Sequence, residues 1–272
     1  MAGRGVPTAP AATVRPAGLP AFFEMAAPEG WQAVDFISDL HLDEALPRTT
    51  EAWMAHLRHT RADCVVMLGD IFELWVGDEQ VDRPFEASCV AAMADAASHR
   101  ELAFMVGNRD FLAGPRLWRE AGLRALPDPT VLDAWGQRVL LTHGDALCLD
   151  DRPYQAFRTE VRGEAWRKAF LARPLADRLA MAAEIRQASR TRRQFDGSSL
   201  ADVDPAEAVK WMHAMGTREM VHGHTHRPGS HALAPGFKRH VLSDWDLDTA
   251  GRAEVLRLTR DGFERVAPAR AT

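Results

Sequence analysis

The chain has 272 residues, of which 46% are apolar, and a formal net charge of −5. This length fits one large domain or one domain with an insertion, and the apolar fraction excludes global disorder. The acidic balance argues against a general nucleic-acid binder. Three cysteines cannot form a fully paired disulfide framework, and no run of 18 apolar residues predicts a membrane span, so we expect a reduced, cytoplasmic protein.

The first 30 residues differ in composition from the rest of the chain. They are rich in proline and alanine and lack the sustained apolar stretch of a secretory signal. We therefore predict a flexible N-terminal tail over residues 1–30 and a single domain over residues 31–272. Within the tail, the apolar segment 19–23 can dock on the body of the protein or touch a membrane surface.

After the tail, short apolar runs alternate with helical patterns. Strands are predicted at Ala33–Ser38, Cys64–Leu68 and Leu102–Val106. Helices are predicted between them at Arg48–Arg61 and Phe85–His99. Strands that alternate with helices indicate βαβ units and a parallel sheet.

The second half of the chain changes character twice. A hairpin is predicted over Val131–Leu141, and a helical pattern without a strand candidate follows at about 150–215. Residues 152–193 contain eleven Lys and Arg against four Asp and Glu, a net charge of +7. Short strands are then predicted at Arg218–Val221, His231–Leu233, Arg239–Leu242, Ala253–Thr259 and Phe263–Ala267. We expect an α/β core closed by antiparallel strands, with a basic helical insertion at about 150–215.

Side chains that can bind metal follow several predicted strands. Sites in open α/β sheets gather at the carboxyl ends of the strands, so these side chains should meet. Four imidazoles, two carboxylates and one amide, without thiolate, suit Mn, Fe or Zn, and seven donors are too many for one ion. The residues are Asp39, His41, Asp70, Asn108, His143, His224 and His226. The pattern predicts two ions about 3.5–4 Å apart that share one carboxylate.

The order and spacing of these motifs resemble the calcineurin-like metallophosphoesterases. The resemblance implies an α/β sandwich in which two β-sheets are flanked by helices. It also implies that one ion, for which Mn²⁺ is favoured, binds Asp39, His41, Asp70 and His226, and that the second Mn²⁺ binds Asp70, Asn108, His143 and His224. Two neighbours, Asp145 and His222, are expected beside the ligands, with Asp145 orienting the His143 imidazole.

Longer segments, at residues 69–78, 107–112 and 143–148, are similar to the UDP-2,3-diacylglucosamine pyrophosphatases of lipid A synthesis, a branch of this superfamily. This similarity implies that water activated by two metals hydrolyses the diphosphate of the nucleotide-sugar lipid to UMP and 2,3-diacylglucosamine 1-phosphate. The enzyme would be cytoplasmic and peripheral to the inner membrane, and we expect a monomer without a nucleic-acid partner. Catalytic roles are implied for Asn108, Arg109 and His224, and substrate contacts for Asn108, Arg109, Asp151, Tyr154, Ser189, Arg193 and His224. A lysine expected after Ser189 is not matched.

Arg109 stands where many phosphomonoesterases of the superfamily have a histidine that protonates the leaving group. Arginine cannot donate a proton near neutral pH, so the leaving group should need little protonation, as a phosphate does. Arg109 can instead hold a diphosphate through two hydrogen bonds. The alternative is that Arg109 only pairs with Asp110 or Glu73.

The basic insertion places apolar residues at helical spacing among arginines, in Ala165–Leu171 and Leu175–Ile185. Such helices can lie on an anionic membrane surface or form a groove for acyl chains. The alternative is an ordinary helical cap with a solvated charged face.

Two other functions stay open. A general nucleotide pyrophosphatase or phosphodiesterase of the same superfamily would not need the insertion, and it would act equally on UDP-diacylglucosamine and UDP-glucose. A non-catalytic interaction module on the same fold would have lost metal ligands, whereas this chain has all seven.

Overall fold

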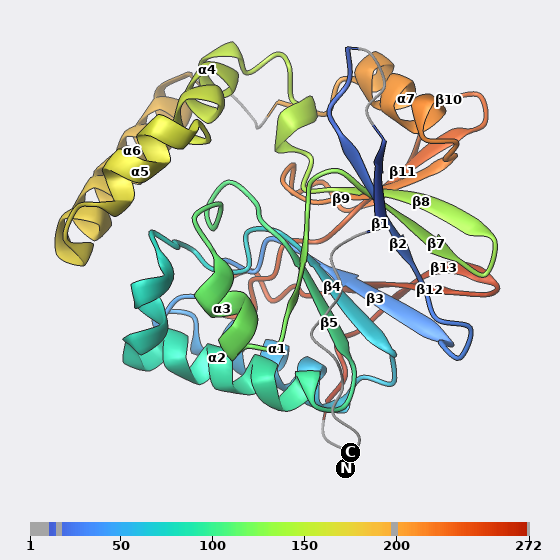
Figure 1. Ribbon diagram of the computed structural model, residues 1–272, viewed down its shortest axis with the longest axis horizontal. Coiled ribbons are helices and arrows are strands. Elements are labelled where there is room, and N and C mark those ends of the chain that lie inside the picture. The colour runs from blue at the N-terminus through green and yellow to red at the C-terminus, as the bar shows by residue number, and fades with distance from the viewer. Residues whose placement is uncertain (1–10, 15–17, 197–200, 271–272) are drawn as a thin grey trace.

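The computed structural model describes residues 11–14, 18–196 and 201–270, with the side chains of 11–14 and 188–196 outside the description. Two β-sheets pack face to face, helices cover both outer faces, and three further helices project to one side (Figure 1). Among the described residues, no helix combines the length and the apolar character that a membrane-spanning segment requires.

The six-stranded sheet contains, in sheet order, β13 (Gly262–Val266), β12 (Val255–Thr259), β3 (Ala33–Ile37), β4 (Cys64–Leu68), β5 (Glu101–Met105) and β6 (Arg124–Leu126). Strands β3 to β6 are parallel, and β12 and β13 are antiparallel at one edge. All residues of β3 and β4 are buried, which explains why β4 is a continuous apolar run and why β3 is apolar apart from Asp35, whose carboxylate is paired with Arg257. The outer face is covered by α1 (Pro47–His59), α2 (Pro84–Ala97) and α3 (Pro115–Glu120), with the 3-10 helix η1 (Asp78–Asp82) between β4 and α2.

The seven-stranded sheet contains, in sheet order, β1 (Ala11–Val14), β2 (Phe22–Ala26), β7 (Thr130–Ala134), β8 (Gln137–Thr142), β9 (Glu219–His222), β11 (Phe237–Val241) and β10 (Gly229–Ala234). Strands β7 and β8 form the predicted hairpin, and β8, β9 and β11 run parallel. Helix α7 (Pro205–Ala214) covers the outer face, and a short 3-10 helix η2 (Asp145–Leu147) follows β8.

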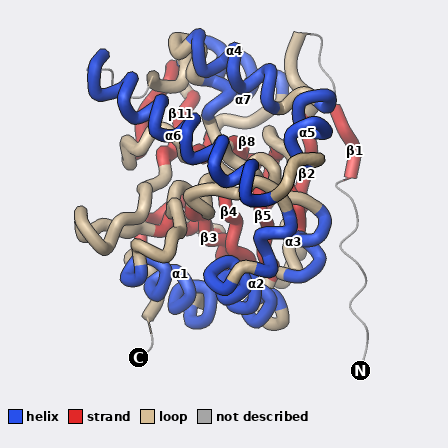
Figure 2. Tube along the Cα trace, turned by 90° about the vertical axis from the view of Figure 1, so that its left-hand side faces the viewer, coloured by secondary structure: helices blue, strands red, loops and turns tan. Residues whose placement is uncertain are grey.

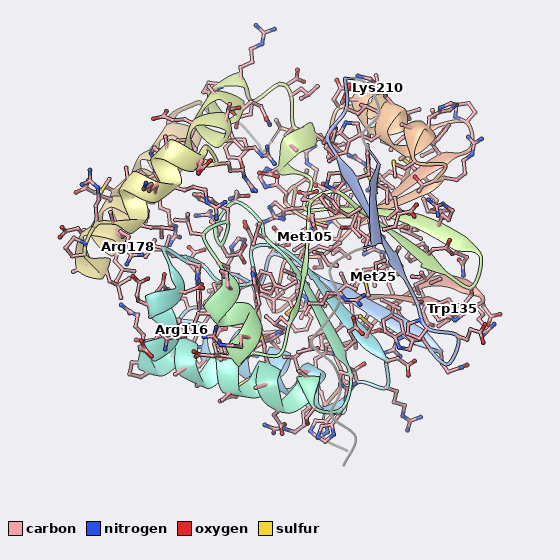
Figure 3. The ribbon with its side chains drawn as sticks, viewed as in Figure 1. Met25, Met105, Arg116, Trp135, Arg178 and Lys210 are labelled. Atoms are coloured by element: carbon pink, nitrogen blue, oxygen red, sulfur yellow. The ribbon has the colours of Figure 1, made fainter. Side chains whose placement is uncertain are left out.

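The main core lies between the two sheets. Met25 of β2 and Met105 of β5 point into it from opposite sheets (Figure 3), together with Phe36, Leu132 and Val221. This packing fixes the two sheets relative to each other at the edge where the strands end, so the side chains that follow those strands have fixed positions.

Helices α4 (Arg152–Val161), α5 (Glu164–Leu171) and α6 (Leu175–Asp196) form an arm, residues 152–196, that stands beside the sandwich (Figures 1 and 2). The arm packs on the loops after β4 and β5 through an apolar cluster that includes Val76, Leu112 and Phe170. Arg178 of α6 is buried and donates to the Val76 carbonyl at 2.6 Å and to Glu79 at 2.6 Å. The arm is thus attached to the same loops that carry the predicted metal ligands.

The structure confirms the α/β sandwich of two sheets flanked by helices, and it corrects two boundaries. Residues 22–26 of the predicted flexible tail form β2, whose Phe22 is fully buried against Trp211 at a ring-centroid distance of 5.9 Å. The helical insertion ends before α7, since that helix buries Trp211 and Met212 on the sheet and belongs to the sandwich. The short elements α3 and β6 were not predicted.

Candidate metal centre

The seven predicted ligands lie just beyond five strand ends. Asp39 and His41 follow β3, Asp70 follows β4 and Asn108 follows β5, all in the six-stranded sheet. In the other sheet, His143 follows β8, and His224 and His226 follow β9. Because the parallel strands of each sheet end at one edge, the two sheets bring all seven side chains to one place.

The backbone at these positions adopts a conformation that is uncommon outside glycine. In the described part of the chain, the non-glycine residues with positive φ are Trp135 in the β7–β8 turn and five of the predicted ligands, with φ between 51° and 64°: Asp39, His41, Asp70, His224 and His226. Such left-handed residues concentrate at functional sites, where the surrounding structure holds them.

Two glycines permit the close approach of the ligand loops. A Cβ at Gly69 would lie 2.6 Å from the Gly107 backbone, and a Cβ at Gly107 would lie 2.2 Å from Asp70 Oδ1. Asp110 joins the same loops, because its two carboxylate oxygens accept hydrogen bonds from the Gly107 and Ile71 amides at 2.7 and 2.9 Å. The glycines and Asp110 therefore fix Asp70 against its neighbours.

One half of the centre consists of Asp39, His41 and His226, whose donor atoms lie within 4.8 Å of one another. The Nε2 atoms of His41 and His226 are 3.4 Å apart, and His226 Nε2 is 3.4 Å from Asp39 Oδ1. Two nitrogens bound to one ion at about 2.1 Å would be about 3.0–3.4 Å apart, so the observed spacing fits two ligands of the same ion.

The other half gathers around Asn108. Its Oδ1 atom lies 3.0 Å from His143 Nε2 and 2.8 Å from His224 Nδ1, and Asp70 Oδ1 lies 3.7 Å from His143 Nε2. Donor atoms of Asp39, Asp70 and His143 again lie within 4.8 Å of one another, so this half adjoins the first through the carboxylates.

The donor set fits divalent metal ions. Asp39 Oδ1 is buried and accepts no hydrogen bond among the described residues, although an isolated buried carboxylate oxygen is unfavourable. A cation would satisfy this oxygen and the facing imidazole nitrogens at once. The nitrogen and oxygen donors, without thiolate, suit a catalytic rather than a structural site.

The electrostatic field at the site favours positive charge. Burial alone would raise the pKa of the Asp39 carboxyl, but contact with His226 and the field of the other histidines hold the pKa well below its usual range. Burial opposes a proton on His143, yet the Asp70 and Asp39 carboxylates raise its pKa to about 9. Burial lowers the pKa of His41 and of His224 to about 4, so both offer neutral imidazole nitrogens at neutral pH.

The predicted substrate residues border this centre. The Arg109 amide donates to Asp70 Oδ1 at 2.7 Å, and its guanidinium Nε is 3.9 Å from Asp70 Oδ2, so the Arg109 side chain faces the Asp70 carboxylate. Tyr154 stacks on the His224 ring at 5.8 Å, while the Asp151 side chain accepts from the Tyr154 amide and caps α4. Ser189 and Arg193 lie in the part of α6 (188–196) whose side chains the structure does not describe.

Asp145 has a different role from the one predicted. His143 Nδ1 donates to the Leu68 carbonyl at 2.8 Å, so this carbonyl, and not Asp145, orients the His143 ring. Asp145 Oδ2 instead accepts hydrogen bonds from two residues of α4 and from Arg162, which directly follows that helix: Tyr154 Oη at 2.6 Å, Arg158 at 2.8 Å and Arg162 at 3.4 Å. The expectation was wrong because spacing along the chain does not say which way a carboxylate turns.

Two carboxylates near the ligands were not predicted as part of the site. Glu73 Oε2 lies 3.3 Å from His41 Nδ1, and Asp244 Oδ2 lies 3.5 Å from His226 Nδ1. Asp244 comes 205 residues after Asp39, the first ligand, and stands in no metal-binding motif, so only the fold brings it here. Glu73 does lie three residues after Asp70, in a segment whose similarity was noted, which is the one signal that could have pointed to it.

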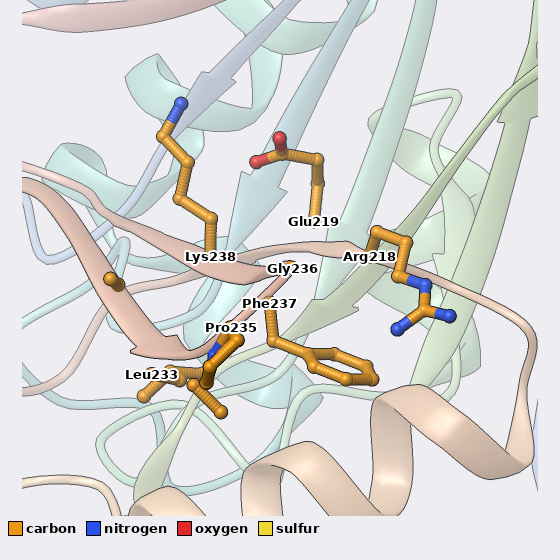
Figure 4. Close-up of a pocket in the computed structure, with 9 residues that line it drawn as sticks. Arg218, Glu219, Leu233, Pro235, Gly236, Phe237 and Lys238 are labelled. Atoms are coloured by element: carbon orange, nitrogen blue, oxygen red, sulfur yellow. The ribbon is translucent and has the colours of Figure 1, made fainter.

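A cavity elsewhere in the molecule is separate from this centre. It measures about 720 Å³ and lies at the β10–β11 hairpin, where Arg218 stacks over Phe237 (Figure 4). None of the seven predicted ligands lines it. We therefore do not assign the metal chemistry to this cavity.

Comparison with known proteins gives a consistent result. The family model described as calcineurin-like phosphoesterase matches residues 33–228. A protein named UDP-2,3-diacylglucosamine hydrolase from Xanthomonas axonopodis pv. citri (strain 306) is 44% identical over 84% of this chain and 95% of its own length. A protein of the same name from Stenotrophomonas maltophilia (strain K279a) is 41% identical over 84% and 95%. Among solved structures, the phosphoesterase Yfce from E. coli is 15% identical, with a TM-score of 0.43 over 87% of this chain and 99% of that one.

Proposed function

Because the chain belongs to the calcineurin-like phosphoesterase family, we propose that it is a metal-dependent hydrolase that cleaves the diphosphate of UDP-2,3-diacylglucosamine in lipid A synthesis. The products would be UMP and 2,3-diacylglucosamine 1-phosphate. The observation that carries the proposal is the convergence of seven nitrogen and oxygen donors beside a basic helical arm, in a chain 44% identical to a hydrolase of that name.

The residues around the centre have distinct tasks in this reaction. Asp39, His41, Asp70 and His226 would hold one ion, and Asp70, Asn108, His143 and His224 the other; we propose Mn²⁺ for both. When bound, the ions supply Lewis-acid activation and neutralise the charge that develops on the phosphoryl group. Arg109 holds a permanent positive charge beside Asp70, where it can bind a diphosphate oxygen and stabilise a phosphate leaving group that needs no acid.

The arm supplies a surface for a lipid. Its apolar cluster with the body contains Trp166, Phe170 and Leu179, which could contact acyl chains. In the described part of the chain, the exposed large hydrophobic side chains all lie on the arm or just before it: Leu149, Phe157, Leu171 and Ile185. Together with the net charge of +7 over residues 152–193, this surface supports the proposal that the enzyme binds peripherally to the inner membrane; we propose that it does so as a monomer.

Contacts with the substrate are proposed at the junction of arm and centre. Tyr154 stacks on His224 and Asp151 caps the same helix α4, and we propose that both contact the glucosamine phosphate. Ser189 and Arg193, further along α6, are proposed to contact the same substrate. A general nucleotide pyrophosphatase is the second candidate, and the apolar cluster of the arm is the feature that disfavours it.

A turnover assay separates the two candidates. Chelator-stripped protein is supplied with Mn²⁺ and then with UDP-2,3-diacylglucosamine or UDP-glucose, and release of UMP is measured. We expect hydrolysis of the lipid substrate alone and its loss in the His224→Ala variant. Equal rates on both substrates would support the general pyrophosphatase, and wild-type activity in His224→Ala would contradict the assigned metal centre.

A further inference from the structure

Three imidazoles of the metal centre have different partners at Nδ1. His143 Nδ1 donates to a backbone carbonyl, that of Leu68, at 2.8 Å. His41 Nδ1 faces the Glu73 carboxylate at 3.3 Å, and His226 Nδ1 faces the Asp244 carboxylate at 3.5 Å. Both histidines backed by carboxylates belong to the half of the centre that contains Asp39.

Each of the two carboxylates is in turn held by an arginine. Asp244 accepts from Arg252 through both oxygens, with Nε at 3.0 Å from Oδ1. Glu73 is paired with Arg186 of α6. The Asp244 and Glu73 side chains are only 9% and 14% exposed, so solvent screens these contacts weakly. The result is two parallel chains of contact, each running from imidazole to carboxylate to arginine.

A second contact ties the Asp244 segment to the same half of the centre. The amide of Trp245 donates to the Asp39 carbonyl at 3.1 Å, and the Trp245 indole is buried and donates to the Glu254 carbonyl at 3.0 Å. The segment that follows β11 therefore positions the backbone of Asp39 and the ring of His226 together.

We propose that Glu73 and Asp244 are positioning residues. They set the metal affinity of the half of the centre with Asp39, His41 and His226 separately from the metal affinity of the half with Asn108. A carboxylate on the far nitrogen fixes the tautomer in which Nε2 presents its lone pair, and it raises the basicity of the ligand. Removal of such a partner typically lowers metal affinity ~10–100-fold. This inference rests on the metal centre of the proposed function and does not depend on the substrate.

The test measures metal binding without turnover. Calorimetric titration of chelator-stripped protein with MnCl₂ should show two bound ions for the wild-type protein. In Asp244→Asn and in Glu73→Gln, one ion should bind ~10–100-fold more weakly, and the other within about threefold of wild type. The matched control is Glu44→Gln, which removes an exposed carboxylate three residues after His41 in the sequence and should leave both affinities unchanged.

Further variants separate positioning from a loss of structure. Thermal unfolding of the metal-free variants shows whether the fold survives. If Asp244→Asn does not fold, the test uses Arg252→Gln, which removes the arginine that holds Asp244, and Glu73→Gln, which removes the carboxylate beside His41. Each of these variants leaves the contacts of the other histidine intact. Asp244→Glu should recover part of the lost affinity. Two ions bound with wild-type affinity in folded Asp244→Asn and Glu73→Gln would overturn the inference alone, whereas failure of the wild-type protein to bind metal would overturn the proposed function.

Discussion

His56 makes the folded state sensitive to acid. It lies on α1 with a fully buried side chain, its Nε2 atom is 3.4 Å from Asp35 Oδ2, and its Nδ1 atom accepts from the Ala269 amide at 3.2 Å. Burial lowers the pKa of His56 to about 4, although the Asp35 carboxylate acts in the opposite direction. The unfolded chain would have the ordinary pKa of about 6.5 at this residue.

The sign of the effect follows from these two values. Above about pH 6.5, His56 is neutral in both states and contributes no pH dependence. As the pH falls from 6.5 to 4, the unfolded chain binds a proton that the folded protein does not, so the free energy of unfolding decreases. The difference between the two pKa values corresponds to roughly 3 kcal/mol, which is lost completely below about pH 4.

Urea denaturation of the metal-free protein between pH 8 and pH 4 measures this loss. The His56→Gln variant cannot bind the proton, so the difference in unfolding free energy between wild type and variant should shift by about 3 kcal/mol over this range. His99, which is exposed, provides the control: His99→Gln should run parallel to wild type. Parallel profiles for wild type and His56→Gln would refute the reasoning.

Three further predictions concern the site and the arm. Asn108→Ala removes the oxygen that lies between two imidazoles, so kcat/KM for UMP release should fall about 10³-fold with an unchanged circular dichroism spectrum. Gly107→Ala places a Cβ 2.2 Å from a buried carboxylate oxygen and should abolish calorimetric metal binding, whereas Gly30→Ala, where a Cβ meets no atom within 4 Å, should retain it. Arg178→Ala removes a buried donor that attaches the arm and contributes about 2 kcal/mol, so limited proteolysis within residues 152–187 should accelerate roughly 30-fold. The control Arg173→Ala changes an exposed arginine and should be cleaved at the wild-type rate. Equal cleavage rates for the two variants would contradict the anchoring role of Arg178.

The central strands could be predicted because their burial leaves a direct trace in the sequence. Strands β3 and β4 are buried on both faces and are apolar apart from Asp35, and each is followed two residues later by an aspartate of the metal centre. The ligands could be grouped because parallel strands end at one edge, which follows from the alternation of strands and helices alone.

The elements that sequence reasoning missed depend on partners far away in the chain. Strand β2 lies in a segment rich in alanine and proline, and it is ordered because Phe22 packs on Trp211, almost 190 residues later. Helix α7 continues the helical pattern of the insertion, and only the burial of its Met212 on the seven-stranded sheet assigns it to the sandwich. Local patterns carry no information about either contact.

The position of Asp145 links the arm to the metal centre more closely than the sequence suggested. Its buried carboxylate accepts hydrogen bonds from Tyr154 and Arg158 on α4 and from Arg162 at the end of that helix. Arg162 also donates to the Gly107 carbonyl at 2.9 Å, directly before Asn108. These arginines hold the pKa of Asp145 well below its usual range against the effect of burial, so the carboxylate stays charged and the contacts stay strong. The first helix of the arm is therefore fixed to the loops that carry Asn108 and His143. A displacement of α4 would therefore displace these ligand loops as well.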